Sequence, residues 1–154
     1  MTAPRAREAK PAILLFYGAL GAAVFANALH AGLRRRWSGY LAALASAASF
    51  VAATVGILSF VSLYVYEHPH HHCPFCLLKP EYGYQGYLLY VPLFVSTAAG
   101  LGAGVLQPFA GVGSLKVLVP RSSGRLAGVA ALAFALFAAV ATIMVLKSNL
   151  ILLS

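Results

Sequence analysis

Four long apolar stretches dominate this chain of 154 residues, and none of them contains Asp, Glu, Lys or Arg. They cover about residues 11–33, 40–66, 87–106 and 126–146. Each is long enough to cross ~30 Å of hydrocarbon as an α-helix rising ~1.5 Å per residue. With 61% hydrophobic and only 9% charged residues, the sequence predicts one all-α integral membrane domain over 1–154, built as a small bundle of four transmembrane helices.

The segments between these spans carry most of the charge. With four spans, both termini and the 67–86 loop lie on one side of the membrane. The Arg34–Arg36 cluster lies on the other side with the 107–125 segment, whose Pro108, Pro120 and glycines predict a basic connecting loop. Six Lys and Arg residues fall on that side against five on the loop side. The positive-inside rule therefore favours an extracytoplasmic 67–86 loop.

The formal net charge of +8 is explained by the bilayer. The basic residues form short clusters at the ends of apolar stretches, where they contact anionic lipid headgroups. No basic surface interleaved with aromatic residues runs far enough to follow a phosphate backbone. The lipid bilayer is thus a predicted partner, and nucleic acid is not.

Small residues mark two of the predicted spans. Ala48, Ala52 and Gly56 recur every four residues in the second span, and Gly100 and Gly104 have the GxxxG spacing in the third. Such faces allow the backbones of membrane helices to approach closely. They also fit a non-catalytic subunit that packs these faces against a larger membrane complex.

Two polar residues interrupt the first span near the basic side. Asn27 and His30 lie one helical turn apart on the same face. Both are a membrane thickness away from the 67–86 loop, so His30 is not predicted to be a ligand of a site there. A polar contact between helices is the predicted role of both side chains.

The segment from Glu67 to Cys76 reads Glu-His-Pro-His-His-His-Cys-Pro-Phe-Cys. It contains both cysteines of the chain and four of its five histidines. Imidazole nitrogen and thiolate sulfur are the side-chain donors that zinc and copper prefer, and two thiols separated by two residues can also close a disulfide. Metal binding and thiol redox chemistry are therefore the two leading interpretations.

Metal binding makes use of the density of histidines. The cysteines supply two thiolates, and any two of the four histidines complete an N2S2 zinc site or a lower-coordinate Cu(I) site. In an extended segment alternate side chains lie on one side, which selects the first and last of three consecutive histidines. The predicted metal ligands are His70, His72, Cys73 and Cys76. The remaining donors are alternate or supporting ligands: Glu67, His68 and His71.

The Cys73-Pro74-Phe75-Cys76 motif resembles both the active-site dithiol of glutaredoxins and one knuckle of a zinc ribbon. A thiol–disulfide oxidoreductase is therefore the alternative, with catalytic Cys73 as the attacking thiolate and catalytic Cys76 as the resolving thiol. In layout such a protein resembles the membrane thiol oxidases of the disulfide-bond B and vitamin K epoxide reductase types. Those relay electrons between two cysteine pairs, whereas this chain has one, so a thiol-exchanging partner protein would supply the second.

Tyrosines follow the cysteines and continue into the third span, among them Tyr87 and Tyr90. They are typical of an aromatic belt at the membrane interface. Under the redox alternative, the same rings would border a pocket for a quinone headgroup.

Our leading hypothesis from the sequence is a membrane protein that binds copper or zinc through its His/Cys loop, for metal transfer to an accepting partner protein or for cofactor assembly. The sequence leaves open whether the protein is an enzyme. Catalysis follows only if Cys73 and Cys76 are redox-active.

Overall fold

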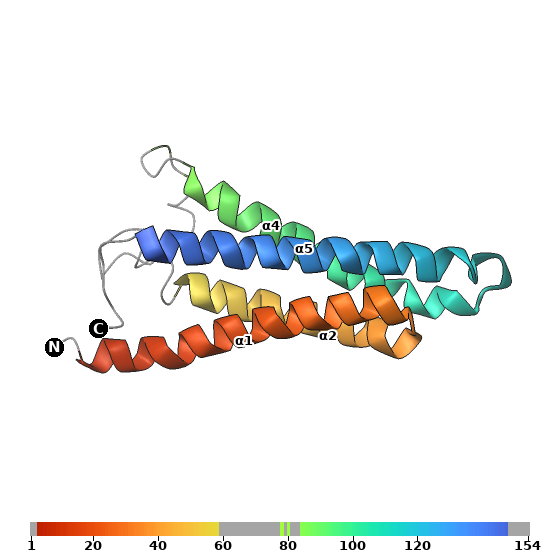
Figure 1. Cartoon of the computed structure of the whole chain (residues 1–154), viewed down its shortest axis with the longest axis horizontal. Helices are drawn as coiled ribbons and strands as arrows, with labels where there is room; N and C mark the ends of the chain where they lie inside the picture. Colours follow the sequence, from red (N-terminus) through yellow and green to blue (C-terminus); the bar gives the residue numbers. More distant parts are fainter. Residues whose placement is uncertain (1–2, 59–77, 79, 81–83, 148–154) are drawn as a thin grey trace.

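The computed structural model describes residues 3–58, 78, 80 and 84–147, and the long elements of this part are four helices (Figure 1). They are α1 (Ala3–Leu33), α2 (Arg36–Gly56), α4 (Gln85–Val105) and α5 (Leu118–Lys147), with the short 3-10 turns η4 (Gln107–Gly111) and η5 (Gly113–Leu115) before α5. Each of the four is long and apolar enough to span a membrane. For the described residues, the prediction of an all-helical fold with four helices long and apolar enough to span a membrane is confirmed.

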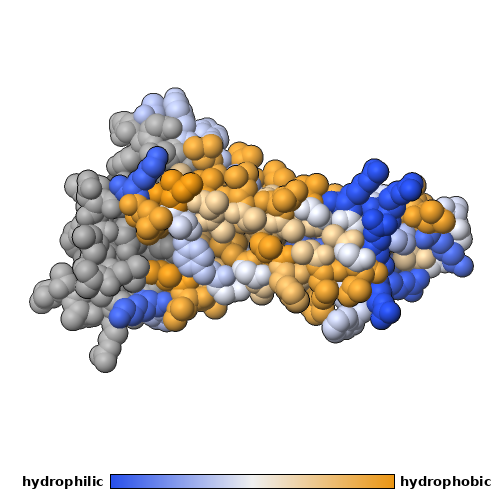
Figure 2. Space-filling view, in the orientation of Figure 1, coloured by the Kyte–Doolittle hydropathy of each residue, from blue (hydrophilic) through white to orange (hydrophobic). Residues whose placement is uncertain are grey.

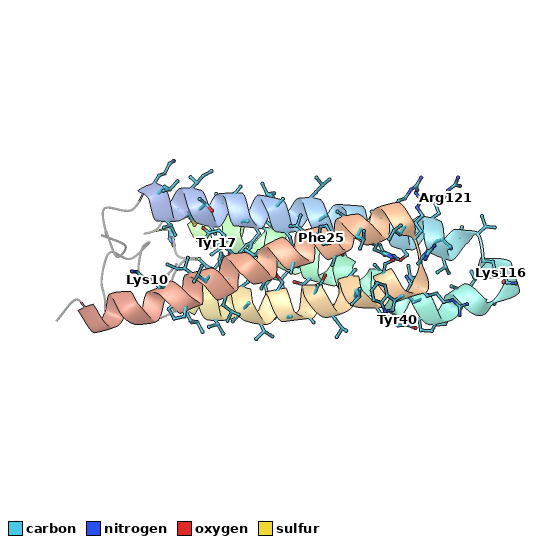
Figure 3. All side chains as sticks on the ribbon, turned by 60° about the horizontal axis from the view of Figure 1, so that its bottom comes forward. Lys10, Tyr17, Phe25, Tyr40, Lys116 and Arg121 are labelled. Carbon is cyan, nitrogen blue, oxygen red and sulfur yellow. The ribbon has the colours of Figure 1, made fainter. Side chains whose placement is uncertain are left out.

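The helices run alternately up and down and pack in a ring. Each contacts two neighbours: α1 lies between α5 and α2, and α4 lies between α2 and α5. Lys10 lies at one end of the bundle and Lys116 and Arg121 lie at the other (Figure 3). We call these the loop end, where α2 finishes and α4 begins, and the basic end (Figure 1).

The core combines a few large side chains with many small ones. Phe16 of α1, Leu93 of α4 and Phe137 of α5 are almost completely buried, and the two phenylalanine rings lie 5.7 Å apart. Outward-facing side chains such as Leu14 and Leu132 are about three-quarters exposed, at 74% and 76%. Figure 2 shows this apolar surface over the middle of the molecule and strongly hydrophilic side chains near the basic end. A surface of this kind suits contact with lipid.

Helix boundaries agree with the sequence at some ends and differ at others. The first span ends at Leu33 as predicted, and α4 lies within two residues of the predicted 87–106. The second span was predicted from residue 40, but α2 begins at Arg36. Its predicted end, 59–66, lies outside the described residues.

The predicted connecting loop over 107–125 is wrong for its second half. Residues 118–125 form the first two turns of α5, and most of 107–115 is 3-10 helix. Pro120 falls in the first turn of α5. There its missing N–H has no intrahelical partner to lose, so the proline starts the helix rather than breaking it.

Helix contacts through small residues are confirmed for α4. A Cβ added to Gly100 would collide with Ser46 of α2, and one added to Gly104 would collide with Ala43. The face predicted on α2 is partly wrong, because Ala48 is exposed. The buried face of α2 instead follows Gly39, Ala42, Ser46, Ser49, Ala53 and Gly56, which is the three- and four-residue spacing of one side of a helix.

Candidate functional site

The predicted metal site and dithiol lie outside the described residues. This applies to all seven side chains of that prediction: Glu67, His68, His70, His71, His72, Cys73 and Cys76. The structure does describe the helices that flank this segment. The end of α2 and the start of α4 are at the same end of the bundle, on the side of Lys10 (Figures 1 and 3).

The start of α4 is marked by tyrosines. Tyr84 adopts a left-handed conformation with φ of 57° and forms the N-cap of the helix, and its ring lies 5.9 Å from that of Tyr87. Both side chains are about half exposed. They therefore lie where an interfacial aromatic belt is expected, at the end of an apolar helix.

A groove opens between α2 and α4 near the loop end. Its volume is about 440 Å³, and it is lined by Phe50, Thr54, Ile57, Leu58, Leu78, Tyr87, Tyr90, Val91, Leu93 and Phe94. Phe94 packs against both Phe50 and Tyr90, with ring centroids 5.8 and 6.5 Å apart. The tyrosines that the sequence placed beside a dithiol thus border an apolar groove.

At the opposite end, four helical segments meet around His30, which is completely buried. Its Nδ1 lies 2.8 Å from the Ser38 hydroxyl of α2 and its Nε2 lies 2.5 Å from the Ser123 hydroxyl of α5. Gln107, at the start of η4, donates from Nε2 to the Ser123 hydroxyl at 2.8 Å. We call His30, Ser38, Gln107 and Ser123 the polar clasp.

Both hydroxyls that contact His30 also reach backbone carbonyls: the Ser38 hydroxyl lies 2.8 Å from the Arg35 carbonyl, and the Ser123 hydroxyl lies 3.1 Å from the Ala103 carbonyl. A neutral imidazole has one donor and one acceptor nitrogen, so His30 donates to one of these serines and accepts from the side of the other. The second amide hydrogen of Gln107 goes to the Ala103 carbonyl at 2.8 Å. Both ring nitrogens of His30 are thus used within the polar clasp.

The shape of the polar clasp depends on Gly39. A Cβ at this position would collide with the side chain of Gln107, which is 3% exposed and crosses the face of α2 here. Glycine therefore leaves the space in which the amide can reach Ser123. The close approach explains why a glycine is found at the end of the first turn of α2.

One helical turn deeper, Asn27 links α1 to α2. Its Nδ2 donates to the Ser46 hydroxyl at 3.0 Å and to the Ala23 carbonyl at 2.8 Å. Oδ1 is buried, has no hydrogen-bond partner within the described residues, and lies 3.5 Å from the position that a Cβ on Gly100 would take. The predicted role of Asn27 and His30 as polar contacts between helices is confirmed.

The polar side chains of the polar clasp bond to one another and to the backbone, and they do not form a metal site. Among the described residues, no three side chains of His, Cys, Asp or Glu come together as metal ligands would. The sequence analysis did not identify Ser38, Ser123 or Gln107 as partners of His30. A single polar residue in a membrane helix can instead bond to the backbone of its own helix, as the Ser46 hydroxyl does with the Ala42 carbonyl at 2.7 Å. The one signal in the sequence was the three- and four-residue spacing of Gly39, Ala42 and Ser46, which places them on the same face of α2.

Comparison of this chain with protein-family models, curated proteins and solved structures finds no match.

Proposed function

We propose that this four-helix membrane protein binds copper or zinc through residues 67–76 and passes the metal to a partner protein or to an assembling cofactor. The observation that carries this proposal is the sequence itself, which places four histidines and two cysteines within ten residues. Neither bilayer packing nor thiol redox chemistry calls for so many imidazoles in one place.

The proposed mechanism follows from the chemistry of the donors. Cys73 and Cys76 bind as thiolates and His70 and His72 bind as neutral imidazoles, so loading releases protons and binding weakens as the pH falls. Glu67 or His68 supports a ligand or replaces one. The metal leaves by ligand exchange, in which donors of the partner displace these ligands one at a time.

The arrangement of the helices supports a site at the membrane surface rather than a path through it. Within the described spans, the only histidine is His30, and both of its nitrogens are bonded in the polar clasp. The apolar spans contain no acidic residue. A metal path would require a series of such donors inside the bundle. We place the loop on the extracytoplasmic side, which the distribution of Lys and Arg favours.

Metal content tests this proposal. The full-length protein is purified anaerobically, its copper and zinc are measured by mass spectrometry, and its free thiols are counted. We expect one metal per chain in the wild type, and less than a tenth of that amount in Cys73→Ser/Cys76→Ser. His70→Ala/His72→Ala should lower the affinity at least tenfold, because half of the ligands are lost.

Lys79→Ala is the matched control, since it changes the same loop without removing a donor, and it should retain the metal. A wild type without metal, or equal metal content in all four proteins, would overturn the proposal.

The groove between α2 and α4 favours a second candidate, the thiol–disulfide oxidoreductase. In that reaction the two thiols close a disulfide and give two electrons and two protons to an acceptor. A lipid-soluble acceptor needs an apolar site at the loop end, which is where Tyr87 and Tyr90 line the groove. Reversible thiol oxidation that survives in His70→Ala/His72→Ala would select this function over metal binding.

A further inference from the structure

The packing of α2 against α4 changes along the bundle. Toward the basic end the two backbones touch, because Gly100 and Gly104 leave no room for a Cβ beside Ser46 and Ala43. Toward the loop end the green start of α4 lies apart from the yellow end of α2 (Figure 1). Large side chains line both helices there, and the groove of about 440 Å³ lies between them.

The groove has a closed floor and an open rim. Ile57 and Leu93 form the floor and are 1% exposed, whereas Val91 and Phe94 at the rim are 55% and 58% exposed. This is the shape of a binding cavity rather than of a flat helix surface, and its volume falls within the range of small-molecule sites.

Its depth in the membrane restricts what can fill it. On α4 the lining runs from Tyr87 to Phe94, within the first ten residues of a spanning helix that begins at Gln85. These residues occupy roughly the first 15 Å below the interface at the helical rise. The hydroxyl of Thr54 donates to the Phe50 carbonyl at 2.9 Å, so it is not directed to a solute. Water finds little to bond in such a groove, so its lining suits apolar molecules of the bilayer.

The aromatic walls favour a ring over a saturated chain. Phe50, Tyr87, Tyr90 and Phe94 all line the groove, and flat rings gain additional attraction from offset or edge-to-face contact with another ring. Tyr87 is at the interfacial end, where its hydroxyl can meet the polar edge of an amphiphile. Phe50 and Phe94 are the lining residues furthest from the loop end, and the aliphatic side chain of Val91 at the open rim suits the tail.

We propose that the groove between α2 and α4 is a binding site for a lipid-soluble amphiphile that has a flat, quinone-like ring and a hydrocarbon tail. The ring lies among the four aromatic side chains and the tail leaves past Val91 into the bilayer. This site does not depend on metal binding by residues 67–76.

Fluorescence quenching in lipid nanodiscs tests the site on the full-length protein. Quinones quench tryptophan, and the single tryptophan of the chain, Trp37, is exposed in the first turn of α2 at the basic end. The reporter is Phe94→Trp in a Trp37→Phe background, and the protein with native Trp37 reports on the basic end. The probe is a decyl-tailed benzoquinone.

We expect saturable quenching of the groove reporter and only weak, linear quenching of Trp37. Phe50→Leu/Tyr87→Leu, which removes two rings and keeps apolar bulk, should weaken quinone binding at least fivefold. Tyr40→Leu is the matched control, because Tyr40 is also about half exposed but lies at the basic end (Figure 3), and it should leave binding unchanged.

Phospholipids with brominated acyl chains provide the competing outcome. If these lipids quench the groove reporter and the quinone adds no saturable quenching, the groove holds an ordinary acyl chain and the proposal is overturned. Equal, linear quenching of both reporters by the quinone would overturn it as well. Saturable quenching by the quinone with the same apparent affinity in brominated and in unbrominated lipid would support it.

Discussion

The two ends of the bundle hold the same helices together in different ways. At the basic end, α2 and α4 meet through glycine and small side chains, and the polar clasp adds hydrogen bonds between α1, α2, η4 and α5. At the loop end, phenylalanine and tyrosine rings separate α2 from α4, and a groove lies between them.

The difference follows from what each side chain can do in hydrocarbon. Lipid tails are as apolar as leucine, so burying leucine between helices contributes little to the free energy of helix association in a membrane. Close backbone packing and hydrogen bonds between helices do contribute to it. The basic end therefore carries the specific pairing of the helices, and the loop end is free to hold a ligand.

Gly100→Leu should have the largest effect on stability, because it removes the close packing that distinguishes the basic end from the loop end. The added side chain has no space beside Ser46, so α2 and α4 must separate and the basic end loses its contact. We expect a loss of about 3 kcal/mol in the free energy of unfolding, at the upper end of overpacking effects. Steric trapping in bicelles would measure it.

Gly18→Leu is the control for Gly100→Leu. A Cβ at Gly18 meets nothing within 4 Å, so this variant should be as stable as the wild type or slightly more stable, because leucine favours helix more than glycine does. Equal stability of the two leucine variants would show that the α2–α4 contact contributes nothing.

His30→Ala should have the next largest effect. It leaves a cavity and removes partners from the hydroxyls of Ser38 and Ser123, and we expect about 2 kcal/mol of destabilisation. A double-mutant cycle with Ser123→Ala should show coupling, because both residues belong to the polar clasp. Additive effects of the two changes would mean that the short His30–Ser123 contact carries no energy.

Tyr17→Phe should have the smallest effect and sharpens the view of the loop end. The Tyr17 hydroxyl bonds to that of Thr142 at 2.8 Å, which joins α1 to α5 outside the polar clasp. Hydrogen bonds between membrane helices average about 0.6 kcal/mol, and we expect a loss of this size. Tyr40→Phe, at an exposed tyrosine, should change nothing. A loss of 2 kcal/mol or more in the free energy of unfolding would show that the loop end is also held together by a strong hydrogen bond.

The fold was largely predictable because hydrocarbon thickness sets the length of a spanning helix. The four spans, the C-terminal end of α1 and both ends of α4 follow from the absence of charge over about twenty residues, whereas α1 begins at Ala3, ahead of the predicted residue 11. The start of α5 was not predicted, because Pro120 and Arg121 were assigned to a loop. Proline is nevertheless well suited to the first turn of a helix.

The candidate sites divide in another way. The sequence predicted that His30 and Asn27 contact other helices, but it could not identify Gln107 as a partner, since this contact joins residues 77 positions apart. The groove likewise depends on how far α2 and α4 diverge, which no local pattern encodes. The metal ligands proposed within residues 67–76 follow from the types of side chain in the sequence alone, and they stay a prediction.

The spacing of the partners of His30 along the chain has a consequence for synthesis. Ser38 is only eight residues away, but Ser123 follows 93 residues later. At a translation rate of ~5–20 residues per second, roughly 5–20 s separate the emergence of His30 from that of its last partner. During this time the first helical hairpin carries an incompletely bonded imidazole.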